Sequence, residues 1–505
     1  MSPNSLQNQP TPEQIEKVKI YIKKNWKTLS RSLSDIVKAA KDPKVCPELD
    51  RICPVYVSPK ENIDLVRENI KKAITEEEFE QIDLRILPGE PEQITEHGLL
   101  YLPHDYVVPG GRFNEMYGWD SYFIILGLLQ DGELNLAKNQ VEQLLYEMEY
   151  YGTILNANRT YLLSRSQPPF LSQSILKLYA KTQDKEWLRS ILPLIEQYYY
   201  YWTVPPHLNQ VTGLSHYYDF AEGPAPEVII SERDEAGRTH YDRVKEYYRN
   251  TDISDYDLEV FYDDKHDNLT DLFYKGDRSM RESGLDITNR FGPFSVDIIH
   301  YAPVCLNCLL YQMEEDISEI NEILGHKDAI DYWKDRAINR KKLINQFFWD
   351  EKSGLYLDYN FVKNRRRYYP YLTTFYPLWV GIASQTQAQR VVNNLALFEV
   401  AGGLKTSDQV TGNQWDAPFG WAPFHLIAVE GLSRYQFDEE ATRIATKFVN
   451  LLIQEFEKKG TLVEKYDVEN CTANVSEEIL FGYSSNEIGF GWTNGVFLEL
   501  LKYIK

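Results

Sequence analysis

Apolar residues recur at spacings of three and four through most of this chain, and this periodicity restricts its fold more than any other feature. One run contains Leu171, Ile175 and Leu178. After a polar break at residues 181–185, the same spacing resumes from Trp187 onward. Residues three or four positions apart lie on one face of an α-helix. The pattern therefore predicts two helices joined by a short turn.

The same analysis predicts further helices. A second candidate hairpin joins residues 424–432 to apolar residues within 444–452, and a third helix is expected over 329–348. Beyond that helix, Gly354 is expected in a turn between two short extended pieces. Recurring hairpins without alternating strands favour an all-α toroid of paired helices over a parallel sheet. An α-solenoid is the alternative, but no repeat of fixed period is visible.

The chain divides into two parts on this interpretation. Residues 1–60 are predicted to form an N-terminal helical extension packed on the main body, and residues 61–505 to form the main, catalytic domain. The segment 222–277 is highly charged and departs from helical patterning. A long excursion of this kind is typical of a lid or loop over a site.

Composition excludes several classes of function. The formal net charge is -21, which disfavours binding to nucleic acid or to an anionic membrane. The polar N-terminus lacks the features of a secretory signal, and no apolar run is long enough to cross a membrane. Five cysteines, an odd and sparse set, fit reduced thiols. We therefore expect a cytoplasmic protein, and we interpret the pair Cys305 and Cys308 as core residues.

Five segments interrupt the helical pattern and concentrate Gly, Pro, Trp, Asp and Arg. They are PGGRFNEMYGWDSYF (109–123), NANRTYLLSRSQPPF (156–170), ESGLDITNRFG (282–292), NQWDAPFGWAP (413–423) and the stretch from VEKYDVEN to GFGWTNG (463–495). Loops at one end of an α/α barrel converge on its axis, so these segments can meet in one pocket. Carboxylates, indole rings and fixed hydrogen-bonding groups together suit the recognition and hydrolysis of a glycoside.

Two of these segments, PGGRFNEMYGWDSYF and QWDAPFGWAP, resemble the two signature patterns of the trehalase family of glycoside hydrolases. LSRSQPPF, EKYD and GFGWTNG are also similar to family segments and follow in family order, so the resemblance spans residues 99–495. It implies an (α/α)6 barrel and hydrolysis with inversion at the anomeric carbon. It also implies Asp286 as the general acid and Glu464 as the general base.

The resemblance further implies a set of substrate-binding residues. The sugar contacts carried over by motif are Arg112, Trp119, Asp120, Asn156, Arg165, Gln167, Glu227 and Gly284. We add as candidates five residues of the same segments and their continuation, namely Phe113, Tyr117, Trp415, Tyr483 and Trp492. Water is the only other reactant, so no metal and no organic cofactor are implied. The partner is a small α-glucoside; the sequence gives no oligomeric state.

The sequence departs from the family at the expected leaving-group subsite. Ala225 stands where an Arg-Pro-Glu motif would place Arg, and Tyr483 stands where a Gly-rich loop would end in Glu. Glu478 or Glu487 would substitute for the latter if the alignment contained a gap. Losing two charged partners would weaken a polar subsite. We therefore expect a small α-glucoside with a short aglycone, such as glucosylglycerol, with trehalose as the alternative substrate.

Two other interpretations compete with these expectations. A non-catalytic sugar-binding relative is one alternative, although both Asp286 and Glu464 are present. The acidic cluster within residues 263–271 suggests calcium, but it lacks the spacing and the glycine of an EF-hand loop. We interpret that cluster as a solvated run of charge.

Overall fold

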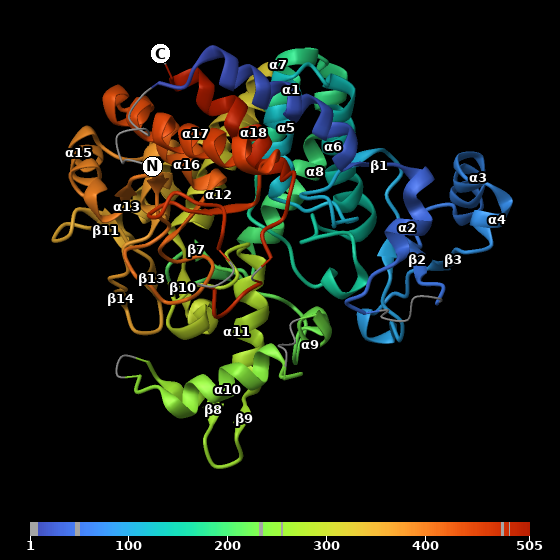
Figure 1. The fold of residues 1–505 in the computed structure, drawn as a ribbon, viewed down its shortest axis with the longest axis horizontal. Coiled ribbons are helices and arrows are strands. Elements are labelled where there is room, and N and C mark those ends of the chain that lie inside the picture. The colour runs from blue at the N-terminus through green and yellow to red at the C-terminus, as the bar shows by residue number, and fades with distance from the viewer. Residues whose placement is uncertain are drawn as a thin grey trace.

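The computed structural model describes residues 9–45, 51–231, 236–253, 256–475, 479–483 and 485–504, and these are mostly helical (Figure 1). The helices of ten residues or more are α1 (Pro12–Leu29), α3 (Ile63–Ala73), α5 (Asp120–Gln130), α6 (Leu134–Tyr146), α7 (Leu171–Thr182), α8 (Lys185–Thr203), α10 (His240–Asn250), α11 (Asp271–Glu282), α12 (Val304–Leu324), α13 (Lys327–Phe347), α16 (Ala422–Arg434), α17 (Asp438–Lys459) and α18 (Gly491–Leu500). Shorter helices are α2 (Ile36–Ala40), α4 (Glu76–Phe79), α9 (Pro226–Ser231), α14 (Tyr376–Trp379) and α15 (Gln385–Asn393).

The predicted hairpins are confirmed. Helices α7 and α8 form the first pair, and α16 and α17 form the second. Helix α13 pairs with α12 and is followed by the strands β11 (Trp349–Asp350) and β12 (Leu355–Tyr356), with Gly354 in the turn between them at a φ of 73°. Cys305 and Cys308 are buried on α12, as the core interpretation expected.

The close crossing of α5 and α18 joins sequence segments that lie far apart. At the crossing, Gly127 of α5 faces Gly495 of α18. A Cβ atom on Gly495 would lie 2.0 Å from the carbonyl oxygen of Phe123, so only hydrogen fits there. The absence of a side chain allows the two backbones to touch, and it brings the segment 109–123 next to the segment 489–495.

Short strands supplement the helices. Antiparallel partners are β1 (Ser30–Arg31) with β5 (Tyr106–Val107), β6 (Leu208–Asn209) with β7 (Leu214–Ser215), β8 (Tyr262–Asp263) with β9 (Asn268–Leu269), β13 (Tyr359–Asn360) with both β10 (Tyr301–Ala302) and β14 (Arg365–Arg366), β15 (Glu399–Val400) with β16 (Gly403–Leu404), and β17 (Phe419–Trp421) with β18 (Lys465–Asp467).

One sheet corrects the expectation of an all-α chain. Strands β2 (Pro54–Val57), β3 (Asp83–Ile86) and β4 (Leu99–Leu100) form a parallel sheet in the order β3-β2-β4, which projects with α3 and α4 at one side of the molecule (Figure 1). All four residues of β2 are buried. A short apolar run of this kind fits a buried strand and a buried helix turn equally well.

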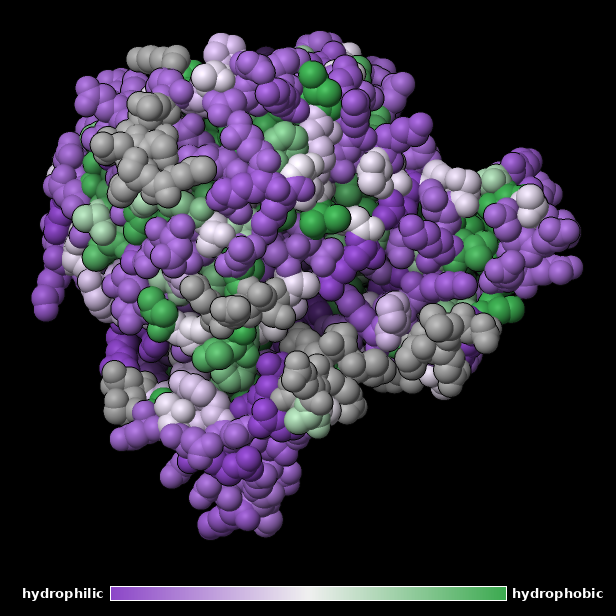
Figure 2. All heavy atoms as spheres, in the orientation of Figure 1, coloured by the Kyte–Doolittle hydropathy of each residue, from purple (hydrophilic) through white to green (hydrophobic). Residues whose placement is uncertain are grey.

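The described residues from 222 to 270 contain α9, α10, β8 and β9 and form a projecting arm (Figure 1), whereas residues 271–277 belong to α11. Figure 2 shows mostly hydrophilic side chains over the tip of this arm. At its base, Arg243 of α10 donates a hydrogen bond to the carbonyl of Leu480 at 3.2 Å, and its guanidinium lies 5.9 Å from the centre of the Phe481 ring. The arm therefore contacts the loop that leads to Tyr483.

Near the N-terminus, α1 packs against α17 and α18. A domain boundary at residue 60 stays a prediction. Within the described ranges, none of the helices combines the length and apolar character that crossing a membrane would need.

We predict that Gly495→Ala destabilises the protein by about 1–3 kcal/mol, because the added methyl group must push α18 away from α5. Thermal unfolding followed by circular dichroism measures the effect. Gly89→Ala is the matched control, since a Cβ atom added there would have no neighbouring atom within 4 Å. Equal melting temperatures for the two variants would contradict the close contact.

Candidate active site

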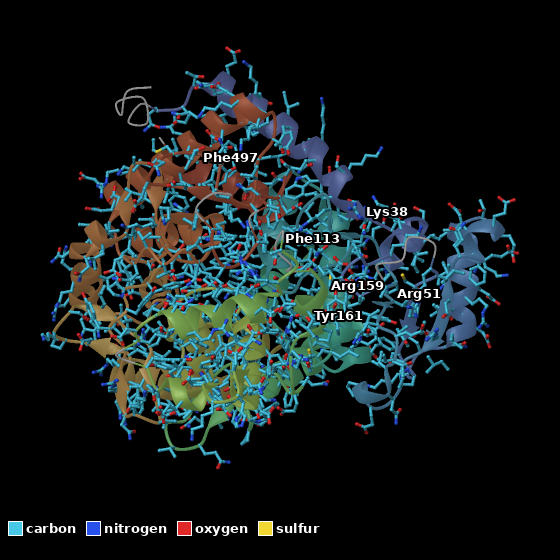
Figure 3. All side chains as sticks on the ribbon, turned by 60° about the horizontal axis from the view of Figure 1, so that its bottom comes forward. Lys38, Arg51, Phe113, Arg159, Tyr161 and Phe497 are labelled. Carbon is cyan, nitrogen blue, oxygen red and sulfur yellow. The ribbon has the colours of Figure 1, made fainter. Side chains whose placement is uncertain are left out.

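A single cavity collects the residues that the sequence selected. It is lined by Lys44, Pro109, Arg112, Phe113, Tyr117, Trp119, Asp120, Asn156, Tyr161, Leu162, Arg165, Gln167, Glu227, Arg281, Gly284, Asp286, Trp415, Glu464, Tyr483, Phe490 and Trp492. Both predicted catalytic carboxylates and all thirteen predicted substrate-binding residues are among them. In Figure 3, the labelled Phe113 and Tyr161 lie near the middle of the molecule.

Indole rings form one wall of the cavity. Trp415 stacks on Trp421 with 3.7 Å between ring centres and 5° between ring planes. Trp119 lies 5.5 Å from Trp492 and 5.9 Å from Trp415. All four rings are almost completely buried. Packed in this way, the rings offer a rigid apolar surface that suits the C–H face of a sugar.

Gly284 allows the loop of Asp286 to approach this wall. Its φ is 71°, a left-handed conformation that glycine adopts without steric cost. A Cβ atom at this position would lie 3.1 Å from the Trp119 ring. Glycine at this position therefore allows both the left-handed turn and the close approach of the loop to the indole ring.

Buried charges also line the cavity. Arg165 forms an ion pair with Glu227, and its Nη1 lies 3.5 Å from Asp219. Burial opposes ionisation of Glu227, but Arg165 and Arg281 outweigh this effect and lower its pKa. Nε and Nη1 of Arg165 are buried and donate no hydrogen bond within the described part of the chain. Arg165 lines the cavity, so its guanidinium lies close to any ligand bound there.

Asp286 lies beside a cation that sequence analysis did not identify. Arg281, on the last turn of α11, has Nη1 3.8 Å from Asp286 Oδ2. Its Nε and Nη2 donate to Asp277 at 3.3 Å, which fixes the guanidinium. The position of Arg281, five residues before Asp286 and directly before the ESG motif, was the available signal.

Glu464 is buried and contacts two neighbours. Tyr483 donates a hydrogen bond from its hydroxyl group to Glu464 Oε1, and Lys465 Nζ lies 3.7 Å from Glu464 Oε2. Burial raises the pKa of Glu464, and Lys465 opposes this rise. Asp120, at the start of α5, also has a strongly raised pKa because it is buried, with Glu464 adding to the effect. The site thus holds carboxyl groups in unequal environments.

Two buried carboxylates anchor the irregular segments. Asp416 accepts hydrogen bonds from the Asn289 amide, from Thr288 and Tyr369 at 2.9 Å, and from Ser407 and Thr411. Because Thr288 and Asn289 donate to it, Asp416 links the segment of Asp286 to the segment of Trp415.

Glu282 does the same for a third segment. It accepts from the backbone amides of Ser166 at 3.0 Å and Tyr218 at 2.7 Å, and from the Tyr201 hydroxyl. Glu282 therefore fixes the chain next to Arg165.

The departures from the family pattern have two different outcomes. Ala225 is buried beneath Tyr241 and does not line the cavity. Tyr483 does line it, as expected, while Glu487 forms an ion pair with Arg112 at 3.0 Å. Glu478 lies outside the described residues. The structure therefore adds Arg281 and Glu487 as charged groups in or beside the cavity.

Paired carboxylates in one cavity, an indole wall and buried hydrogen-bonding groups are the components that glycoside hydrolysis requires. Together with the helical fold, they define the class of this protein as a glycoside hydrolase. Within that class, the chain belongs to the trehalase family, whose sequence model matches residues 6–505.

Individual relatives agree with this assignment. The chain is 34% identical to a cytosolic neutral trehalase of Kluyveromyces lactis and 33% identical to one of Saccharomyces cerevisiae, in each case over 95% of this chain and 70% of the relative. The solved neutral trehalase of Saccharomyces cerevisiae matches with a TM-score of 0.80 and 29% identity, covering 97% of this chain and 94% of that one.

A more distant likeness concerns the fold alone. A mannosylglycerate hydrolase from Thermus thermophilus, solved in complex with glucose, matches with a TM-score of 0.52 and 17% identity. It covers 78% of this chain and 95% of that one.

We predict that Asp416→Asn lowers the melting temperature and reduces glycosidase activity, because an amide nitrogen would face donors that need an acceptor. Leaving buried donors unsatisfied costs about 1–3 kcal/mol each. Differential scanning calorimetry and a glucose-release assay measure the two effects. The partly exposed Asp408→Asn, on the same loop, is the control and should match the wild type in both measurements.

Proposed function

We propose that this chain hydrolyses α,α-trehalose to two glucose molecules with inversion at the attacked carbon. The observation that carries the proposal is the cavity in which Asp286 and Glu464 lie among the family's sugar-binding residues. The names of the relatives support trehalose as the substrate. The expectation of glucosylglycerol gains no support from them, and trehalose replaces it as the principal proposal.

The charged residues around the cavity supply a physical reason for this change. The short-aglycone expectation assumed that a cation and an anion were missing from the subsite. Arg281 lines the cavity beside Asp286, and Glu487 is paired with Arg112 at its edge. A guanidinium and a carboxylate are therefore present from other positions, and a polar second sugar ring can be bound.

In the proposed mechanism, Asp286 donates a proton to the glycosidic oxygen as that bond breaks. Glu464 removes a proton from a water molecule that attacks the anomeric carbon from the opposite side. Burial favours the neutral form of Glu464, which strengthens it as a base once it is ionised. The indole wall and the Arg165 pair orient the glucosyl ring.

Two broader assignments belong to the same proposal. We infer that the paired helices form the (α/α)6 barrel of the family, with the five irregular segments at one end. We also infer a cytoplasmic location, which the relatives named cytosolic neutral trehalases support. A non-catalytic role is disfavoured because both proposed catalytic carboxylates line the cavity.

Inversion predicts the products. Trehalose should initially release α-glucose and β-glucose in equal amounts, because one anomeric centre inverts and the other keeps its configuration. Proton NMR during the first minutes of the reaction measures the ratio. Asp286→Asn should fold normally and reduce kcat by about 10²–10⁴-fold, the contribution of a general acid. Initial release of α-glucose alone would exclude inversion.

The substrate preference has its own test. We expect kcat/KM to be higher for trehalose than for glucosylglycerol, and Arg281→Met to reduce the value for trehalose by about tenfold or more, which corresponds to about 1.4 kcal/mol. The exposed Arg443→Met is the control, since Arg443 pairs with Glu399 away from the cavity. Faster hydrolysis of glucosylglycerol by the wild type would restore the original expectation.

A further inference from the structure

We propose that Lys465 is the positioning residue of the general base: its ammonium group keeps Glu464 ionised and fixes both the loop of Tyr483 and the backbone of Asp286. This inference rests on the proposed function, because it assigns a role around the base of that reaction.

Lys465 is a fully buried cation held by defined partners. Its side chain has no exposed surface, and it lies on β18, paired with Trp421 of β17. Its Nζ donates to Gln414 Oε1 at 2.8 Å and to the carbonyl of Tyr483 at 2.9 Å. Nζ also lies 3.8 Å from the centre of the Tyr483 ring. These contacts fix the ammonium group in one place.

The first consequence concerns the base itself. Glu464 Oε1 accepts a hydrogen bond from Tyr483, whereas Oε2 accepts none from the described residues and lies 3.7 Å from Lys465 Nζ. The loop of Tyr483 is tied to Lys465 through its carbonyl group. The cation therefore acts on both oxygens, directly on Oε2 and through the Tyr483 hydroxyl on Oε1.

The second consequence concerns the acid. Gln414 accepts from Lys465 with its amide oxygen, so its amide nitrogen points the other way and donates to the backbone carbonyl of Asp286. Gly482, with a φ of 107°, leaves the space that this amide fills, because a Cβ atom there would lie 2.7 Å from Gln414 Cδ. One ammonium group thus sets the backbone positions of both catalytic segments.

A packing role alone does not explain a charge at this position. A buried ammonium group loses its hydration, and an apolar side chain would fill the same volume without that cost. Burial lowers the pKa of Lys465 to about 8, while Glu464 acts to raise it. The lysine is therefore mostly charged at neutral pH and loses its charge in mildly alkaline solution.

Several charged groups face this pair and must be included in any interpretation of pH dependence. Glu464 and Lys465 interact with Arg112, Asp120, Asp286, Tyr483 and Glu487. Arg112 opposes the charge on Lys465 and favours the charge on Glu464. Removing Lys465 leaves Arg112 as the one remaining cation among the named neighbours of Glu464. The pKa of Glu464 should therefore rise.

The test measures kcat/KM against pH for the wild type, Lys465→Met and Lys465→Gln. Substrates are trehalose and α-glucosyl fluoride, whose fluoride leaves without a proton from the acid. Without the lysine, the acidic limb of the kcat/KM profile should move to higher pH by about one unit, because Glu464 loses the positive charge that favours its ionised form. The maximum should fall by about 10- to 100-fold on both substrates, part of the contribution of a general base.

Controls separate this role from general damage. Lys405→Met removes a lysine that pairs with Glu469 at 2.8 Å outside the cavity, and its pH profile should match the wild type. Asp286→Asn should lose activity on trehalose but retain it on the fluoride. Tyr483→Phe, which removes one oxygen atom, should also move the acidic limb upward.

Each outcome bears on the proposal. The proposal is overturned if the Lys465 variants fold and the acidic limb of their kcat/KM profile stays at the wild-type pH. It is also overturned if these variants lose activity on trehalose alone and not on the fluoride. If the lysine variants do not fold, an unmoved limb in Tyr483→Phe overturns it instead. A wild type that cleaves the fluoride but not trehalose refutes the substrate alone, and the Lys465 test proceeds on the fluoride. Inactivity on both substrates overturns both proposals.

Discussion

Buried carboxylates that accept hydrogen bonds from several segments hold this structure together around its cavity. Helices satisfy their own backbone groups, but the five irregular segments cannot, and a buried polar group without a partner is costly. Asp416 and Glu282 solve this problem by accepting from backbone amides and side-chain hydroxyls of segments that are distant in sequence. The packed helices supply the frame, and these two anions determine how the loops meet.

The cavity places unlike groups side by side, and its chemistry follows from that contrast. The indole wall is apolar and rigid, whereas Arg165 and Glu227, which also line the cavity, form a buried ion pair. Glu464 lines the same cavity, and burial and a neighbouring cation shift its pKa in opposite directions. A carboxylate balanced in this way responds to small changes in its surroundings, which suits the role of general base proposed for Glu464.

Much of the fold and site could be predicted from two kinds of sequence pattern, the spacing of apolar residues and the motif segments. The spacing of apolar residues indicated α7 and α8, and the motif segments indicated the residues that line the cavity. Other features depend on burial, which one sequence does not reveal. Lys465 looks like an ordinary charged residue beside Glu464, and the four-residue strand β2 is too short for its period to be assigned. Arg281 was missed because its place beside Asp286 depends on the direction of its side chain, although its position just before the ESG motif was a signal.

The crossing of α5 with α18 also sets the order in which the protein matures during its synthesis. The cavity is lined by residues as far apart in the sequence as Arg112 and Trp492, so it cannot be complete until residue 492 has been synthesised. Ribosomes add about 5–20 residues per second, and the interval between these two positions lasts roughly 20–75 s. During that time the apolar face of α5 that will meet α18 has no partner. Nascent chains therefore lack a complete cavity until residue 492 has been added.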